Sequence, residues 1–307
     1  MTGAGPPDPA AAGRLMRRAA IASLVVAGGL IALKALAWFA TGSVAMLSSL
    51  LDSLLDLAAS AVNFLAIRTA TTPADAEHRF GHGKAEPLAG LAQAAFVAGS
   101  ATLLLFEAAQ LLAAPKPVVR AELGIAVSLL SIAATVGLVL FQRRVVARTG
   151  SVAVAADSLH YIGDVLLNGA VIAALALTAW LDLPLLDPLF AIAIAGWILR
   201  SAWLIGRSSL DLLMDRELPD RDRERILAIA RTHPDVRGVH DLRTRSAGTQ
   251  VFIQLHLDLD ATMTLGRAHA IADEVEHRIL AAFPNAEVIT HQDIAGFVEA
   301  RRDAVGA

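Results

Sequence analysis

Six long apolar segments constrain this chain more than any other feature of its sequence. Each has the length of about 20 residues or more that a helix needs to cross the ~30 Å hydrocarbon core of a bilayer. The composition agrees, because 55% of the residues are hydrophobic and only 18% are charged, below the ~25% typical of soluble domains. We therefore expect a polytopic α-helical membrane protein with six transmembrane helices, over residues 19–40, 44–67, 87–112, 121–142, 151–180 and 184–205.

Two of these segments carry polar side chains at matching positions. The second contains Asp52 and Asp56, and the fifth contains His160 and Asp164. Each pair is spaced i,i+4, which places both side chains on one face of a helix. A charged group within hydrocarbon is tolerated only where a partner or water receives it. Three carboxylates and an imidazole at one point favour a divalent cation site, and a buried helix with satisfied polar groups is the alternative.

The distribution of basic residues predicts the orientation of the helices. Arginine and lysine cluster before the first apolar segment and in the loops after the second and the fourth. By the positive-inside rule, both termini are then cytoplasmic. The two halves of three helices have opposite orientations, and the four ligand groups meet near the middle of the membrane. This is the inverted repeat of secondary transporters, which bind their substrate between the halves.

The chain becomes more polar after about residue 211. Its pattern predicts a helix over 221–232, strands over 241–245 and 251–258, a helix over 265–283 and a strand over 287–292. This αββαβ order is that of a small cytoplasmic α+β domain. The expected regions are a disordered tail, a transport domain, a cytoplasmic metal-binding domain and a second tail, over residues 1–13, 14–210, 211–296 and 297–307.

A second group of ligand-type residues lies in the loop between the second and third apolar segments. Asp75, His78 and His82 fall within eight residues, a spacing that can bind a divalent metal. Gly81 and Gly83 give the backbone the freedom to wrap an ion. Solvated loop side chains are the alternative interpretation.

A third group lies in the cytoplasmic domain, at predicted strand ends and at a helix start. The fold could bring these residues together as a metal site, with satisfied or solvated histidines as the alternative. They are His240, His256, His269, His291 and Asp293. The two remaining histidines of the domain, His233 and His277, look like ordinary surface residues.

The composition and motifs exclude several classes of function. The chain has no cysteine, so disulfides, Fe–S clusters and thiolate sites are excluded. A net charge of −3 gives no indication of nucleic acid binding, and no Gly-rich loop with Lys-Ser/Thr indicates ATP. We expect a secondary active transporter rather than an enzyme. A membrane-embedded metallohydrolase is an alternative that lacks a His-Glu-x-x-His motif, and a metal sensor acting through the cytoplasmic domain leaves the membrane ligands unexplained.

Several segments together resemble the cation diffusion facilitator family along residues ~14–296, and in particular its bacterial zinc/proton antiporters. They are LLDSLLD, FGHGKAE, ADSLHYIGD, HDLRTR, FIQLHL and HQD. The resemblance implies that the three groups above are a transport site, a loop zinc site and a binuclear zinc site bridged by Asp293. It also implies a metallochaperone-like, ferredoxin-like cytoplasmic domain, and a salt-bridge network through Lys84 and Asp215 near a homodimer contact.

The resemblance implies a function as well. We expect a homodimer in the bacterial inner membrane that exports Zn²⁺, and also admits Cd²⁺ or Fe²⁺, in exchange for protons by alternating access. Asp157, one turn before His160, has no ligand role in this comparison. It is expected to help hydrate a vestibule on the cytoplasmic side.

Overall fold

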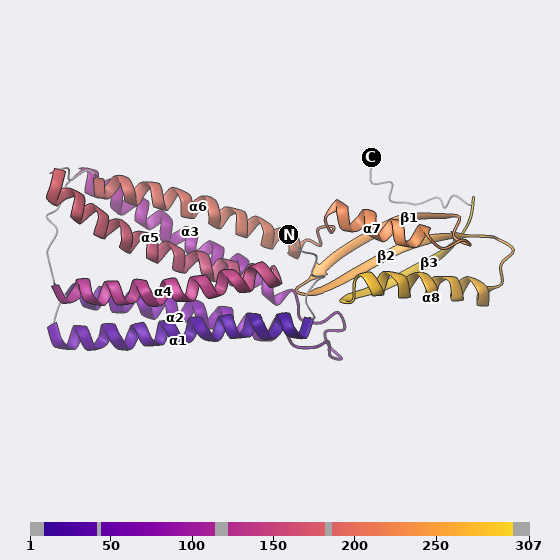
Figure 1. Cartoon of the computed structure of the whole chain (residues 1–307), viewed down its shortest axis with the longest axis horizontal. Coiled ribbons are helices and arrows are strands. Elements are labelled where there is room, and N and C mark those ends of the chain that lie inside the picture. The colour runs from indigo at the N-terminus through magenta and orange to yellow at the C-terminus, as the bar shows by residue number, and fades with distance from the viewer. Residues whose placement is uncertain (1–8, 42–43, 114–121, 182–185, 297–307) are drawn as a thin grey trace. The chain divides into compact units, whose positions relative to one another are not determined.

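The computed structural model describes residues 9–41, 44–113, 122–181 and 186–296 (Figure 1). These residues form two compact units that meet in sequence at residues 214 and 215. The first unit is entirely helical, and the second combines helices with a sheet.

Six long helices make up the first unit, in the predicted order. Among the residues that the structure describes, the first four helices contain segments long and apolar enough to cross a membrane. This confirms the predicted class of a polytopic α-helical membrane protein. The helices are α1 (Pro9–Thr41), α2 (Val44–Ala70), α3 (Ala85–Ala113), α4 (Glu122–Thr149), α5 (Val152–Leu181) and α6 (Leu186–Leu213).

The prediction of a disordered tail over residues 1–13 is wrong for residues 9–13, because α1 already begins at Pro9. The start of α1 is held by packing. Met16 is 1% exposed and belongs to an apolar cluster that includes Ile67 of α2, Val145 of α4 and Val154 of α5. Packing against neighbouring helices, rather than intrinsic propensity, supplies most helix stability in proteins. A Pro/Gly/Ala-rich composition therefore did not prevent a helix here.

The pairing of the helices agrees with two related halves of three. In such a repeat α2 corresponds to α5 and α3 corresponds to α6. The structure packs α3 against α6 along their length (Figure 1), and α2 contacts α5. When two halves are related by a two-fold axis, corresponding helices that lie near the axis pack against each other. The contact of α2 with α5 brings together the two helices that carry the predicted membrane ligands.

The beginning of α3 is joined closely to the beginning of α5 and the end of α6. Glu86 is 4% exposed, and its carboxylate accepts hydrogen bonds from the Ser151 hydroxyl and from the first two backbone N–H groups of α5. A carboxylate at this position satisfies N–H groups that have no partner within the helix. One turn later, a Cβ atom at Gly90 would lie 2.8 Å from Ser209 Oγ of α6 and 3.3 Å from Val152 Cγ2. Glycine is therefore needed for this close helix packing.

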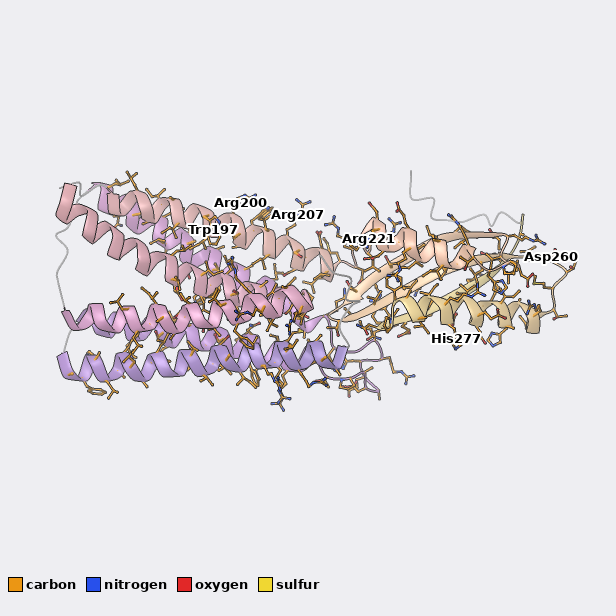
Figure 2. All side chains as sticks on the ribbon, in the orientation of Figure 1. Trp197, Arg200, Arg207, Arg221, Asp260 and His277 are labelled. Atoms are coloured by element: carbon orange, nitrogen blue, oxygen red, sulfur yellow. The ribbon has the colours of Figure 1, made fainter. Side chains whose placement is uncertain are left out.

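The outer surface of the helical unit is apolar. Large exposed side chains include Leu36 at 70%, Phe39 at 78% and Trp203 at 70%. Trp197 of α6 (Figure 2) is 43% exposed as well. Lipid solvates apolar side chains on such a surface, whereas water would not. The exposed residues thus agree with a unit embedded in a bilayer.

The second unit has the predicted αββαβ order. Its three strands lie in the order β1-β2-β3, with β1 antiparallel and β3 parallel to the central strand. A parallel connection requires a crossover, which α8 provides. Ile226 of α7, Leu255 of β2 and Ile271 of α8 are each 0% exposed in the core. The elements are α7 (Asp220–Arg231), β1 (Gly238–Ala247), β2 (Gln250–Leu259), α8 (Leu265–Ala282) and β3 (Ala286–Ile294).

The interpretation of His233 as a surface histidine is wrong, because it is 3% exposed. Its Nδ1 accepts a hydrogen bond from the backbone N–H of Asp235 at 3.2 Å. Nε2 then carries the proton and donates to Glu274 of α8 at 3.1 Å. His277 of α8 is exposed, as predicted (Figure 2). The two histidines look alike in sequence, but only one ties the end of α7 to α8.

Replacing His233 by Ala should destabilise the second unit by about 2 kcal/mol, since it leaves a cavity and removes two buried hydrogen bonds. His277→Ala is the matched control, and it should change stability by less than about 0.5 kcal/mol. Thermal unfolding of the second unit in the detergent-solubilised chain measures the change in stability of both variants relative to wild type. Equal stability of the two variants would contradict the structural role of His233.

Candidate metal sites

The predicted membrane site is assembled between α2 and α5. Asp56, His160 and Asp164 each offer a ligand atom, and these atoms all lie within 4.8 Å of one another. Nε2 of His160 lies 2.9 Å from Oδ1 of Asp56 and 3.9 Å from Oδ2 of Asp164. The side chain of Asp52 lies outside the described residues. The structure therefore brings together three of the four predicted ligands.

The surroundings of His160 hold its ring in place. The residue is 8% exposed, and its ring meets that of Phe96 edge to face at 5.8 Å between centroids. The carboxylates are more open, with 22% of the Asp56 side chain and 38% of the Asp164 side chain exposed. A buried imidazole beside two reachable carboxylates suits a cation that must enter and leave.

The expectation that Asp157 hydrates a cytoplasmic vestibule is wrong. Asp157 is 1% exposed, and its carboxylate accepts hydrogen bonds from Ser23 at 2.6 Å and from Gln142 at 2.7 Å. No face of this side chain is open to a water-filled passage. Its environment is a closed polar cluster between helices.

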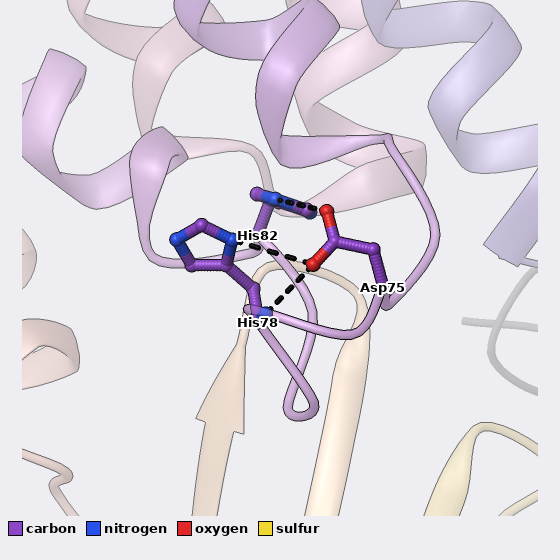
Figure 3. A group of neighbouring side chains, drawn as sticks. All are labelled: Asp75, His78 and His82. Atoms are coloured by element: carbon purple, nitrogen blue, oxygen red, sulfur yellow. Dashed lines mark hydrogen bonds and ion pairs between the residues drawn. The ribbon is translucent and has the colours of Figure 1, made fainter.

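The loop before α3 brings together all three of its predicted ligands, Asp75, His78 and His82 (Figure 3). Asp75 Oδ1 lies 3.4 Å from Nδ1 of His78, and Asp75 Oδ2 lies 3.4 Å from Nε2 of His82. The two rings are 4.5 Å apart between centroids. Gly81 has a φ of 76°, which glycine adopts without strain and which lets the loop fold back on itself.

Backbone N–H groups stabilise the ionised form of Asp75. Its Oδ1 accepts hydrogen bonds from the N–H groups of His78 at 2.7 Å and Glu77 at 2.9 Å. The bond from His78 is the largest cause that holds the pKa of Asp75 below its ordinary value. Hydrogen bonds to the charged form stabilise that form. The carboxylate is therefore ionised at neutral pH, as a metal ligand must be.

The sheet of the second unit assembles a third group. His240, His256 and His291 occupy one row across β1, β2 and β3, as directly paired residues. Asp293 lies among them, with its Oδ2 2.6 Å from His256 Nδ1 and 3.2 Å from His240 Nε2, and its Oδ1 3.2 Å from His291 Nε2. One carboxylate thus contacts three imidazoles from three strands. This arrangement suits a carboxylate shared between two ions.

The same contacts decide the charge of Asp293. Burial acts to raise its pKa, but the hydrogen bond from His256 and the rings of His291 and His240 outweigh burial, so the pKa lies below its ordinary value. The row of histidines and a single ionised carboxylate fit a divalent metal such as Zn²⁺, for which imidazole and carboxylate are usual ligands. His240, His256, His291 and Asp293 would hold it.

His269 does not join this group in the structure. It lies on α8 with 72% of its side chain exposed, and its Nε2 is 3.6 Å from Asp273 on the same helix. Two further carboxylates were missed in the sequence. Asp258 lies 3.4 Å from His240, and Asp241 lies 3.6 Å from His256. The i,i+2 spacing of His256 and Asp258 on one strand is a signal that could have found the first.

Asp241 could not have been found from spacing. The register of β1 against β2 shifts between His240 and Arg243, and Asp241 has a φ of 45°. In a regular strand, the side chain of Asp241 would point to the opposite face from the row of histidines. The irregularity turns it toward that row. The predicted salt-bridge residues have contacts within their own units: Lys84 donates to the backbone oxygen of Leu212, and Asp215 lies 3.5 Å from Arg245.

A bundle of membrane-spanning helices with an Asp/His cluster between two of them, joined to a small domain with a histidine-rich sheet, defines a membrane protein that handles divalent metal ions. Residues 20–214 match the family model of the cation efflux transmembrane domain, and residues 218–295 match that of the cation efflux protein cytoplasmic domain. The chain belongs to the cation efflux family, which is the cation diffusion facilitator family of the sequence resemblance. It is a cation efflux transporter.

Curated relatives match over most of the chain. The cation-efflux pump FieF of Klebsiella pneumoniae is 48% identical over 288 residues, which cover 94% of this chain and 96% of the relative. The FieF of Shewanella oneidensis is 51% identical over 282 residues, covering 91% and 94%. Among solved structures, one of the putative zinc transporter CzrB is 33% identical and covers 26% of this chain and 99% of its own, with a TM-score of 0.25.

Proposed function

We propose that this transporter exports Zn²⁺ in exchange for protons. The observation that carries the proposal is the group of Asp56, His160 and Asp164 between α2 and α5, in the helical unit that spans the membrane. The sequence adds Asp52, four residues before Asp56, as the fourth ligand of the proposed site. An ionisable cluster inside a membrane bundle is the usual mark of an ion pathway.

The donor atoms favour a borderline divalent ion. Zn²⁺ accepts a tetrahedral set of imidazole nitrogen and carboxylate oxygen. The single nitrogen donor, His160, raises affinity for Zn²⁺ above that of an all-oxygen site, while the three carboxylates also admit Cd²⁺ or Fe²⁺. Mg²⁺ would require near-octahedral oxygen coordination, which two i,i+4 pairs do not offer.

The same ligands can couple metal to protons. A metal binds the deprotonated forms of histidine and aspartate, so binding releases any protons that the empty site holds. Carboxylates crowded around one point repel each other, and desolvation also disfavours their charged forms. An empty site that faces the acidic side takes up protons and gives them up when Zn²⁺ binds from the cytoplasm. Each cycle then returns protons as it exports metal.

The proposal includes the setting of the transporter. Both termini lie in the cytoplasm of a bacterium, with the helical unit in the inner membrane. The arginines near the start of α1 and those at the ends of α2 and α4 support this orientation by the positive-inside rule. The chain acts as a homodimer, with Lys84 and Asp215 in a network near the contact between copies. The loop group and the sheet group bind resident Zn²⁺ that stabilises or regulates the transporter.

A pH gradient should drive Zn²⁺ against its own gradient in proteoliposomes that contain the purified chain. An imposed Zn²⁺ gradient should move protons in the opposite direction, because both ions use one site. Fluorescent indicators for Zn²⁺ and for pH inside the vesicles measure both fluxes, and protein-free vesicles are the control. Zn²⁺ flux that ignores the pH gradient, without counter-movement of protons, would make the protein a passive facilitator. No flux at all would favour a hydrolase or a sensor.

A further inference from the structure

Five buried polar side chains form a cluster one helical turn away from the membrane metal ligands. Every one of them is at most 1% exposed. Asp157 of α5 lies at the centre and accepts hydrogen bonds from Ser23 of α1, Ser60 of α2 and Gln142 of α4. Tyr161 of α5 joins the cluster through Ser60. The cluster therefore joins four helices, and none of its members belongs to the three metal groups.

Two chains of hydrogen bonds end on the carboxylate of Asp157. Gln142 Nε2 donates to Ser23 Oγ at 2.9 Å and to Asp157 Oδ2 at 2.7 Å, and Ser23 Oγ donates to the same oxygen at 2.6 Å. On the other side, Ser60 Oγ donates to Asp157 Oδ1 at 3.5 Å and lies 2.9 Å from the Tyr161 hydroxyl. Linked hydrogen bonds of this kind polarise and strengthen one another in a low dielectric.

The cluster lies on the same two helices as the membrane ligands. Ser60 follows Asp56 by four residues on α2, and Asp157 precedes His160 by three residues on α5. Both intervals place the pairs on one face of their helix. One turn of helix advances about 5.4 Å. The contacts of Ser60 with Asp157 at 3.5 Å and with Tyr161 at 2.9 Å thus connect α2 to α5 one turn from the point where Asp56 meets His160.

Packing on the far side of the cluster excludes water. One or two turns further along the same helices, Ile67, Val145 and Val154 are each at most 2% exposed and belong to one apolar cluster with Met16. A carboxylate in this position costs free energy unless it is fully hydrogen-bonded. Removing its hydrogen-bond partners would therefore change how α1, α2 and α4 pack against α5, rather than how the site is hydrated.

We infer that Asp157 is a positioning residue of the transport site: its hydrogen bonds to α1, α2 and α4 set the distance between α2 and α5 at which Asp56, His160 and Asp164 converge on one ion. This inference rests on the proposed function. Mutating a residue that holds metal ligands in position, without binding the metal itself, typically lowers metal affinity about 10–100-fold. Loss of this link should weaken metal binding more than it slows the transport step.

The test is a set of Zn²⁺ flux measurements on the full chain in proteoliposomes, with KM and kcat determined separately. Asp157→Asn keeps the size of the side chain but presents an N–H₂ group to donors, and it should raise KM about 10-fold. Ser60→Ala removes the link to α2 while Asp157 itself stays unchanged, and it should also raise KM. Ser158→Ala is the matched control on α5, because Ser158 is 4% exposed and its Oγ has no hydrogen-bond partner among the described residues.

The outcomes separate this inference from the proposed function. If the wild-type chain moves no Zn²⁺, the proposed function fails. If wild type transports and both variants keep KM within about twofold, Asp157 does not position the ligands and the inference fails. A lower kcat with an unchanged KM also overturns it, since the cluster would then act in the conformational step. If size-exclusion chromatography shows that Asp157→Asn does not fold, the KM of Ser60→Ala decides the question. A combined variant that adds no further rise in KM would support one shared link.

Discussion

Metal efflux should fall by at least about 100-fold when Asp164 is replaced by Ala, a loss of roughly 3 kcal/mol. Asp164 supplies one of the oxygen atoms that lie within 4.8 Å of each other in the membrane site. Without it, an ion is left with incomplete coordination, and the Asp56–His160 pair loses a neighbour from the same helix face. The rate of Zn²⁺ uptake into proteoliposomes measures the effect.

The control for this variant is another carboxylate of the same chain. Asp220 is at the start of α7 with 90% of its side chain exposed, so Asp220→Ala should transport at the wild-type rate. Size-exclusion chromatography should show both variants as folded protein. Zn²⁺ flux near the wild-type rate in Asp164→Ala would refute the placement of the transport site between α2 and α5.

The metal preference should change when His160 is replaced by Asp. This residue provides the only nitrogen donor of the membrane group, and its loss gives an all-oxygen site. Carboxylate ligands suit Mn²⁺, whereas imidazole favours Zn²⁺. We expect the ratio of Zn²⁺ to Mn²⁺ transport to drop by about tenfold, or roughly 1.4 kcal/mol. Competition between the two ions in the same proteoliposomes gives this ratio directly.

Two further substitutions make the selectivity experiment specific. His277→Asp changes an exposed histidine of α8 and should leave the ratio unaltered. His82→Asp changes a ligand of the loop group. The ratio of Zn²⁺ to Mn²⁺ transport could instead change in His82→Asp and stay unchanged in His160→Asp. Selectivity would then be set in the loop before the ion enters the membrane, and the role given to His160 would be wrong.

The order of helices and strands could be predicted from the sequence because it depends on local patterns. Apolar length identified the membrane helices, and alternation identified β1, β2 and β3 to within a few residues of their ends. The spacing of His160 and Asp164 was equally local, since any helix places i and i+4 on one face. That these residues would meet Asp56 needed one more step, the matching position of the two segments within the two halves.

Other features depended on which helix faces which. Asp157 lies three residues from His160, and nothing in the sequence says that Ser23 and Gln142 lie against it rather than water. His233 and His277 differ in the same way: one is buried against α8 and the other faces outward. His269 has a ligand-type side chain, yet its position on α8 keeps it with Asp273 and outside the group around Asp293.

The sequence by itself determined that this chain crosses a membrane and that a cytoplasmic-type α+β domain follows. It also indicated three groups of Asp and His residues, one at matched positions of two repeats, one close along the chain and one at predicted strand ends and a helix start. These properties come from hydrophobic length, periodicity and short spacing. Only the tertiary structure decided that Asp157 of α5 is enclosed by α1, α2 and α4 instead of facing water. The reason is that burial and hydrogen bonding depend on the packing of helices that are distant in sequence, as for Asp157 and Gln142.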